Sequence, residues 1–203
     1  MTATTALPEA IPAAGDHHIR ATLLELARRA IAHGLAHGQP LPQASAELPP
    51  FLAEHRASFV TLTRHGRLRG CIGRLEAARP LGEDVADNAF AAAFRDPRFA
   101  PLQDAEFAEL RLAVAVAVLT VPEPLPVRGE AELLARLEPG EHGLILELGA
   151  HRATFLPKVW EQLPDAREFV AQLKRKAGLP ADHWSAALRF WVYRSIDYSE
   201  DGS

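Results

Sequence analysis

The stretch ASFVTLTRHGRLRGCIGRL, residues 57–75, decides the fold of this 203-residue chain. Apolar and polar side chains alternate through residues 57–64, which is typical of a half-buried β-strand. The pair His65-Gly66 follows, and a glycine-containing pair of this kind turns a chain back on itself. Residues 67–75 then predict a second strand. The whole stretch therefore predicts an antiparallel hairpin with two glycines, Gly70 and Gly73, inside its second strand.

Helices and further strands flank this hairpin on both sides. Apolar residues recur with helical spacing after Asp16, a typical N-cap residue, as far as Gly38, and a second helical pattern covers residues 81–93. Residues 112–121 are rich in valine and predict a central strand. Later segments predict two helices (130–137 and 168–178) and three strands (142–149, 151–157 and 188–196). Strands joined by short turns, with helices inserted between them, predict an α+β fold with a mainly antiparallel sheet and flanking helices.

The length and the proline pattern predict how the chain is divided. A chain of 203 residues fits one domain with a larger body and a smaller lobe. Prolines make the segment near 121–127 stiff and extended, so we expect it to connect the body to the lobe. Residues 1–15 carry short apolar pieces broken by prolines and predict a flexible N-terminal tail, which leaves 16–203 as the folded domain.

Composition excludes several classes of protein. The net charge is −4, from 22 Lys and Arg against 26 Asp and Glu, which argues against binding a nucleic-acid backbone. A single cysteine excludes an internal disulfide, and no basic segment followed by an apolar run opens the chain, so we expect a cytoplasmic protein. The longest apolar stretch, 112–119, has eight residues. A membrane span needs roughly 20.

The hairpin also concentrates chemically interesting residues. Residues 64–79 hold five arginines, three glycines and the only cysteine, Cys71. In a regular strand Arg67, Arg69 and Cys71 share one face, while Leu68 and Ile72 point to the core on the other. Glycines inside a strand mark a bulge or a close approach to the backbone, and a ligand is one group that could approach.

Two interpretations of Cys71 follow from the residue types. Arg69, two residues away, favours a thiolate in a partly dry site, which would make Cys71 reactive. Free cysteines are also common as small buried apolar residues, in which case the arginines form a solvated strand face. Arg98, in the DPRF loop that follows a helix, either caps that helix or faces a cleft.

Other catalytic and cofactor patterns are missing from the sequence. His33 and His37 are four residues apart on one helix face, but no third ligand accompanies them, so we expect neither a metal nor another cofactor. Neither the glycine pattern of dinucleotide-binding proteins nor that of P-loops occurs, and no G-x-S-x-G serine motif exists.

The motif LRGCIG, residues 68–73, resembles the AMMECR-type domain family, which includes the A protein of the AmmeMemoRadiSam system. Residues 59–99 and 143–180 also resemble this family, so the likeness covers roughly 19–198. The resemblance implies an α+β fold with a body and a smaller lobe, and a cleft between them beside LRGCIG. It implies site residues in the motif and around it: Arg69, Gly70, Cys71, Gly73, Glu76, Asn88, Arg98 and Phe99. The name of the system implies two partners, a Memo-like protein related to dioxygenases and a radical SAM protein.

Two functions remain open at this point. In the first, the chain has a small-molecule site at the LRGCIG cleft, where Cys71 is the candidate catalytic thiol and Arg69 and Arg98 hold an anionic group. In the second, the domain is a non-catalytic adaptor that binds the Memo-like or radical SAM partner through its glycine-rich face. The acidic charge balance and the lack of an acid–base dyad fit this second function.

Overall fold

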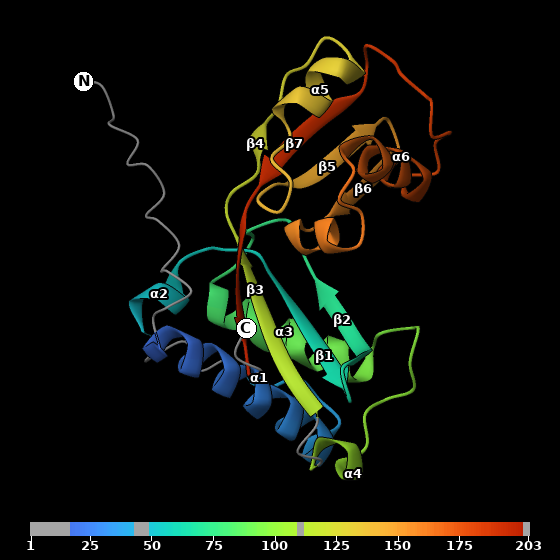
Figure 1. Ribbon diagram of the computed structural model, residues 1–203. Helices are drawn as coiled ribbons and strands as arrows, with labels where there is room; N and C mark the ends of the chain where they lie inside the picture. Colours follow the sequence, from blue (N-terminus) through green and yellow to red (C-terminus); the bar gives the residue numbers. More distant parts are fainter. Residues whose placement is uncertain (1–16, 43–48, 109–111, 201–203) are drawn as a thin grey trace, which may run out of the picture. The chain divides into compact units, whose positions relative to one another are not determined.

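The computed structural model describes residues 17–42, 49–108 and 112–200 (Figure 1). The predicted N-terminal tail, residues 1–15, lies outside the described residues. The chain divides into two compact units, one made of the described residues up to Leu119 and from Ile196 onward, the other of Thr120–Ser195. Each unit has its own four-stranded sheet. The chain therefore has the predicted α+β fold with mainly antiparallel pairing.

The first unit is built on a sheet with strand order β2-β1-β3-β8. Strand β1 pairs antiparallel with β2 on one side and with β3 on the other. The strands are β1 (Ser58–Arg64), β2 (Arg67–Gly73), β3 (Leu112–Leu119) and β8 (Ser195–Ser199). Because β2 and β8 lie at the two ends of this order, β2 is an edge strand.

Two long helices cover this sheet. Helices α1 (His17–His37) and α3 (Leu81–Phe94) pack against each other, and α3 also contacts β1 and β2 while α1 contacts β3. Their apolar faces enclose the inward-facing side chains of the central strands, among them Val60, Leu62, Val114 and Val116, which are all completely buried. Two short helices, α2 (Pro50–Ala53) and α4 (Asp104–Phe107), complete the unit.

The hairpin forms as predicted, with one difference in its second strand. His65 and Gly66 both have positive φ, 52° and 72°, which is the two-residue turn that suits the twist of the strands. Leu62 pairs with Gly70 and Thr63 with Leu68, so Arg69 is an extra residue opposite β1. Such a bulge reverses the alternation of side chains on one side of it.

Because of this bulge, some side chains of β2 face the opposite side of the sheet from the one predicted. Leu68 was expected in the core but is 45% exposed, so that prediction is wrong, whereas Ile72 packs against the core as predicted. Cys71 pairs with Thr61, and Leu68 pairs with Thr63. Since Thr61 and Thr63 share a face of β1, Leu68 rather than Arg67 lies on the same face of the sheet as Cys71.

The second unit has the strand order β4-β7-β5-β6. Its strands are β4 (Glu123–Pro124), β5 (Gly143–Leu148), β6 (His151–Phe155) and β7 (Arg189–Tyr193). Helices α5 (Glu130–Arg136) and α6 (Ala166–Lys176) and the 3₁₀ helix η1 (Pro157–Glu161) supply apolar side chains to a separate core. The Trp160 and Phe169 rings stack there with centroids 3.8 Å apart.

The last predicted strand differs from the structure. The segment 188–196 was expected to be one strand, but the chain forms β7 in the second sheet and then β8 in the first. The apolar pattern continues across Arg194, so the sequence alone does not reveal that the chain changes sheet there.

Candidate functional site

Cys71 lies on β2 with its side chain half-buried. The Thr61 hydroxyl of the neighbouring strand donates to its sulfur, with Oγ1 and Sγ 3.4 Å apart. The main chain of Cys71 faces the free edge of the sheet, where its N–H donates to Asp96 Oδ2 at 2.9 Å and its carbonyl accepts from Arg98 Nη2 at 3.1 Å. Two side chains from the loop after α3 therefore take the place of a neighbouring strand.

Asp96 and Arg98 form the ion pair that holds this edge. Arg98 donates from Nε to Asp96 Oδ1 at 2.9 Å and from Nη2 to Oδ2 at 2.7 Å, and the Arg98 N–H also donates to Oδ1. The hydrogen bonds from Arg98 hold the pKa of the buried Asp96 carboxyl well below its usual range, and Asp96 in turn raises the pKa of Arg98. The pair therefore stays ionised at neutral pH.

Arg98 keeps part of its guanidinium available. Its side chain is 54% exposed. Its Nη1 makes no hydrogen bond with any residue that the structure describes. This nitrogen can therefore donate to a second acceptor without breaking the pair with Asp96.

Arg69, the bulge residue, has a different partner. Its Nε and Nη2 donate to the two oxygens of Glu106 on α4, both at 2.9 Å, and Nη2 also donates to the Ala100 carbonyl. These bonds lower the pKa of Glu106. Arg69 Nη1 is buried and has no hydrogen-bond partner among the described residues. Two of the three guanidinium nitrogens of Arg69, Nε and Nη2, therefore already bond to the Glu106 carboxylate.

Phe99 joins the two arginines. The Arg69 and Arg98 guanidinium carbons lie 5.8 and 5.5 Å from the centroid of its ring, within the range of cation–π attraction. The structure thus brings together four of the residues singled out in the sequence, Arg69, Cys71, Arg98 and Phe99. Arg98 does not cap the helix with its side chain, because that side chain bonds to Asp96 and to the edge of β2.

The two glycines of the motif have packing roles inside the unit. A Cβ on Gly70 would lie 2.1 Å from the Ala92 carbonyl oxygen, so α3 rests directly on β2 at this point. A Cβ on Gly73 would lie 2.2 Å from the Phe59 ring. The close approach predicted at these glycines is made by the protein itself.

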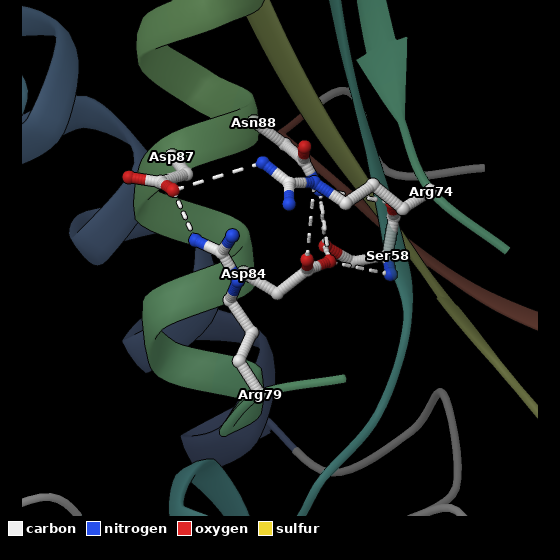
Figure 2. A network of polar contacts seen from close by, with 6 residues as sticks. All are labelled: Ser58, Arg74, Arg79, Asp84, Asp87 and Asn88. Carbon is white, nitrogen blue, oxygen red and sulfur yellow. Dashed lines mark hydrogen bonds and ion pairs between the residues drawn. The ribbon is translucent and has the colours of Figure 1, made fainter. Parts of the chain in front are cut away.

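Two further residues that the family resemblance implied for the site are Asn88 and Glu76. Asn88, on α3, is buried and donates from Nδ2 to Asp84 Oδ2 at 2.8 Å and to the Ser58 carbonyl at 3.1 Å (Figure 2). Glu76 is exposed in the segment between β2 and α3. Asn88 therefore belongs to the polar group around Asp84.

Comparison with known proteins identifies the chain. The family model described as AMMECR1 matches residues 24–198, most of the chain and parts of both units. This chain belongs to the AMMECR1 family. A Methanopyrus kandleri protein is 38% identical over 190 residues, covering 88% of this chain and 87% of its own. A Methanothermobacter thermautotrophicus protein is 38% identical over 183 residues, covering 89% and 94%.

A solved structure supports the fold of this AMMECR1-family chain. The crystal structure of an uncharacterized protein from Pyrococcus horikoshii matches with a TM-score of 0.81 and 35% sequence identity. The match covers 89% of this chain and 90% of that one.

Sequence reasoning missed three polar residues at the site of this AMMECR1-family chain: Thr61, Asp96 and Glu106. Asp96 had a local signal, because it stands two residues before Arg98 in the DPRF run. Glu106 had none, because it is 37 residues from Arg69 along the chain and only the fold brings them together.

His33 and His37 stack with ring centroids 4.2 Å apart, and no group of three His, Cys, Asp or Glu residues in the described segments is placed to hold a metal ion. Among the described helices, none is long and apolar enough to cross a membrane.

Proposed function

We propose that this AMMECR1-family protein binds a small anionic molecule beside the Cys71 thiol and acts together with a Memo-like protein and a radical SAM protein. One observation carries the small-molecule part. Asp96 and Arg98 bind the main chain of Cys71, which is only partly buried, and Arg98 Nη1 has no hydrogen-bond partner among the described residues. The LRGCIG resemblance supports the two partners.

The two arginines have different roles in this proposal. Arg98 binds the anionic group through Nη1, because its other nitrogens already bond to Asp96 and the Cys71 carbonyl. Arg69 is a positioning residue, since its pairing with Glu106 places its charge beside the Phe99 ring and leaves little capacity for a ligand. Cys71 carries the only thiol of the chain, and its carbonyl bonds to the Arg98 guanidinium, so Cys71 is the candidate nucleophile.

Alkylation with two reagents tests this proposal. Because Cys71 is the only cysteine, intact mass after labelling reports on one site. Iodoacetate carries a negative charge and iodoacetamide is neutral, so the ratio of their rates at Cys71 measures attraction of an anion to the thiol. We expect this ratio to be several-fold higher than for a free thiol such as glutathione, and to fall in Arg98→Gln.

Arg95→Gln is the matched control. It removes the same charge three residues away, and the Arg95 guanidinium lies over the Phe90 ring, 4.8 Å from its centroid. We expect the rate ratio to stay at the wild-type value in this variant. A wild-type ratio equal to that of glutathione, or an equal fall in both variants, would rule out an anion site at Arg98.

The adaptor function is favoured by one observation of its own. Leu68 is 45% exposed and lies on the same sheet face as Cys71, so a large apolar side chain faces outward beside the motif. Exposed apolar side chains are often buried by partners. In this function Leu68→Ser weakens the complex with the Memo-like or radical SAM protein, whereas Cys71→Ala leaves it intact. Sedimentation velocity at micromolar concentrations measures both, and no complex with the wild-type chain would exclude the adaptor.

A further inference from the structure

A second polar cluster surrounds Asp84, in the first half of α3 (Figure 2). The Asp84 side chain is completely buried. Its Oδ2 accepts three hydrogen bonds, from the Ser58 N–H at 2.8 Å, the Ser58 hydroxyl at 2.7 Å and Asn88 Nδ2 at 2.8 Å. One carboxylate oxygen is therefore fully used in joining α3 to the start of β1.

The other oxygen of Asp84 is not used in this way. Oδ1 is buried and has no hydrogen-bond partner among the described residues. The nearest cation is Arg74, with Nε 3.8 Å from Oδ1, which is too long for a hydrogen bond. Burying a carboxylate oxygen without a hydrogen-bond donor costs desolvation free energy. The unpaired Oδ1 therefore indicates that a donor from a bound molecule pairs with it.

Arg74 shows the complementary pattern. It follows directly after β2, its side chain is 44% exposed, and Nη2 lies 3.8 Å from Asp87 Oδ2. The Arg74 guanidinium makes these two ion pairs but no hydrogen bond with any described residue. Donors on Arg74 and an acceptor on Asp84 thus face each other across a gap slightly too wide for a direct bond.

A second guanidinium adds positive charge at the same place. Arg79 bonds through Nη1 to Asp87 Oδ2, and its side chain is 29% exposed. Asp87 therefore lies between the two arginines, as Figure 2 shows. The cluster offers several guanidinium donors for an anion and, at Asp84 Oδ1, a single acceptor for a hydroxyl group.

We propose that Arg74, Arg79 and Asp84 form a binding site for a tetrahedral oxyanion that carries a proton, of the hydrogen phosphate type. Its hydroxyl oxygen bridges the gap, donating to Asp84 Oδ1 and accepting from Arg74 Nε. With hydrogen bonds of about 2.8 Å, such an oxygen stands to one side of the line between the two atoms and reaches both. The other oxygens accept from the two guanidinium groups. Because the Arg74 side chain is half-exposed and lacks hydrogen bonds, it can move aside to admit the anion and then close on it, so that Nε bonds to the hydroxyl oxygen.

The acceptor at Asp84 gives the site its selectivity. Sulfate has the same shape and charge as hydrogen phosphate but carries no proton at neutral pH, so it cannot donate to Asp84 Oδ1. Sulfate would instead place a negative oxygen against a buried carboxylate, which is repulsive. We therefore expect discrimination between two anions that a simple arginine cluster would bind alike.

Titration of the whole chain with inorganic phosphate and with sulfate tests the site. Both titrations are run at pH 7 and equal ionic strength and followed by backbone amide NMR shifts. We expect phosphate to shift the amides of residues 74–79 and of Asp84, and to bind at least tenfold more tightly than sulfate, as a lost charge-assisted hydrogen bond implies. Equal affinity for the two anions, or no phosphate-dependent shift at these amides, would overturn the proposal.

Variants separate the two kinds of contact. Arg74→Gln removes an exposed side chain that makes no hydrogen bond, so the fold should be kept while phosphate affinity falls about tenfold. Arg175→Gln, which removes the same charge from an exposed position on α6, should leave it unchanged. Asp84→Asn should abolish the preference for phosphate over sulfate. Where that variant does not fold, the comparison of the two anions on the wild-type chain decides alone. Wild-type phosphate affinity in Arg74→Gln would contradict the site.

Discussion

Two buried aspartates of the first unit show how the surroundings of a single residue set its behaviour. Asp96 accepts three hydrogen bonds from Arg98, whose guanidinium lowers the pKa of that carboxyl. Burial raises the pKa of Asp84, and the hydrogen bonds from Ser58 oppose this effect only in part. The ionised form of Asp96 therefore stabilises the fold, whereas ionising Asp84 has a cost. This contrast fits a structural role for Asp96 and a binding role for Asp84.

Asp96→Asn is expected to destabilise the protein by about 2 kcal/mol at pH 7, because it removes charge-assisted hydrogen bonds to Arg98 and Cys71. The folded pKa of Asp96 is lower than the unfolded value of about 4, so its stabilisation is present above that pH and is lost as the pH falls below it. Urea denaturation at pH 7 and pH 3 measures both effects. The difference between wild type and variant should shrink at pH 3.

The exposed Asp182 supplies the control for this prediction. Asp182→Asn should change the free energy of unfolding by less than about 0.5 kcal/mol at either pH. A loss in Asp96→Asn that is the same at pH 3 and pH 7 would show that the charge of Asp96 is not what stabilises the edge of β2.

At the residue scale, the sequence predicted identities better than orientations. Cys71, Arg69, Arg98 and Phe99 were singled out from one motif and its neighbourhood, and they lie together. The predicted orientation of the Leu68 side chain was wrong, because the bulge at Arg69 adds one residue and reverses the alternation of side chains beyond it. Whether a strand forms a bulge depends on what packs against it, which the local sequence does not show. The carboxylates that neutralise the arginines come from other elements, so no local pattern could reveal them.

At the element scale, the contact between β2 and α3 explains a glycine of the motif. A Cβ on Gly70 would meet the Ala92 carbonyl oxygen at 2.1 Å, and this atom belongs to a helix backbone that cannot rotate away. The neighbouring residues Val85, Ala89 and Ala93 of α3 are buried in the same core. The small residue at position 70 therefore sets how closely the helix approaches the sheet.

Gly70→Ala is expected to lower the free energy of unfolding by about 2 to 3 kcal/mol, since the strand and the helix must move apart. Gly129→Ala is the control, because a Cβ there meets nothing within 4 Å and its φ of −167° suits any residue. We expect a loss of less than about 1 kcal/mol for it, the cost of alanine at a helix N-cap. Thermal and urea unfolding compare the two. Equal losses would mean that the β2–α3 contact is not tight.

The elements with strong periodic patterns were the ones that the sequence predicted. The helix of 17–37, the hairpin and the valine-rich strand of 112–119 agree with the structure because local spacing determines them. Short pieces such as β4 and α4 were missed, since they carry too few residues to show a period. Their formation depends on contacts with distant segments: in the pairing of β4 with β7, Glu123 lies opposite Val192 and Pro124 opposite Trp191.

At the scale of the whole molecule, the chain leaves the first unit after Leu119 and returns at Ile196. The returning segment forms β8 beside β3, and Glu200 then binds two elements at once. Its Oε2 accepts from the Val114 N–H of β3 at 2.9 Å and from Arg28 Nη2 of α1 at 2.7 Å. The segment from Ile196 thus completes the first unit, and the second unit, Thr120–Ser195, is inserted within it.

Glu200→Ala is therefore expected to destabilise the first unit selectively, by about 2 kcal/mol, because Arg28 and the Val114 N–H both lose their charged acceptor. Native-state hydrogen exchange resolves the two units, since each has its own sheet and core. Protection of amides in β1 and β3 should fall while that in β5 and β7 stays constant. Glu25→Ala, which removes an exposed acid from α1, should change neither. If protection in β5 and β7 falls equally, the two units unfold together. The contacts of Glu200 with Arg28 and Val114 would then stabilise both units rather than the first unit alone.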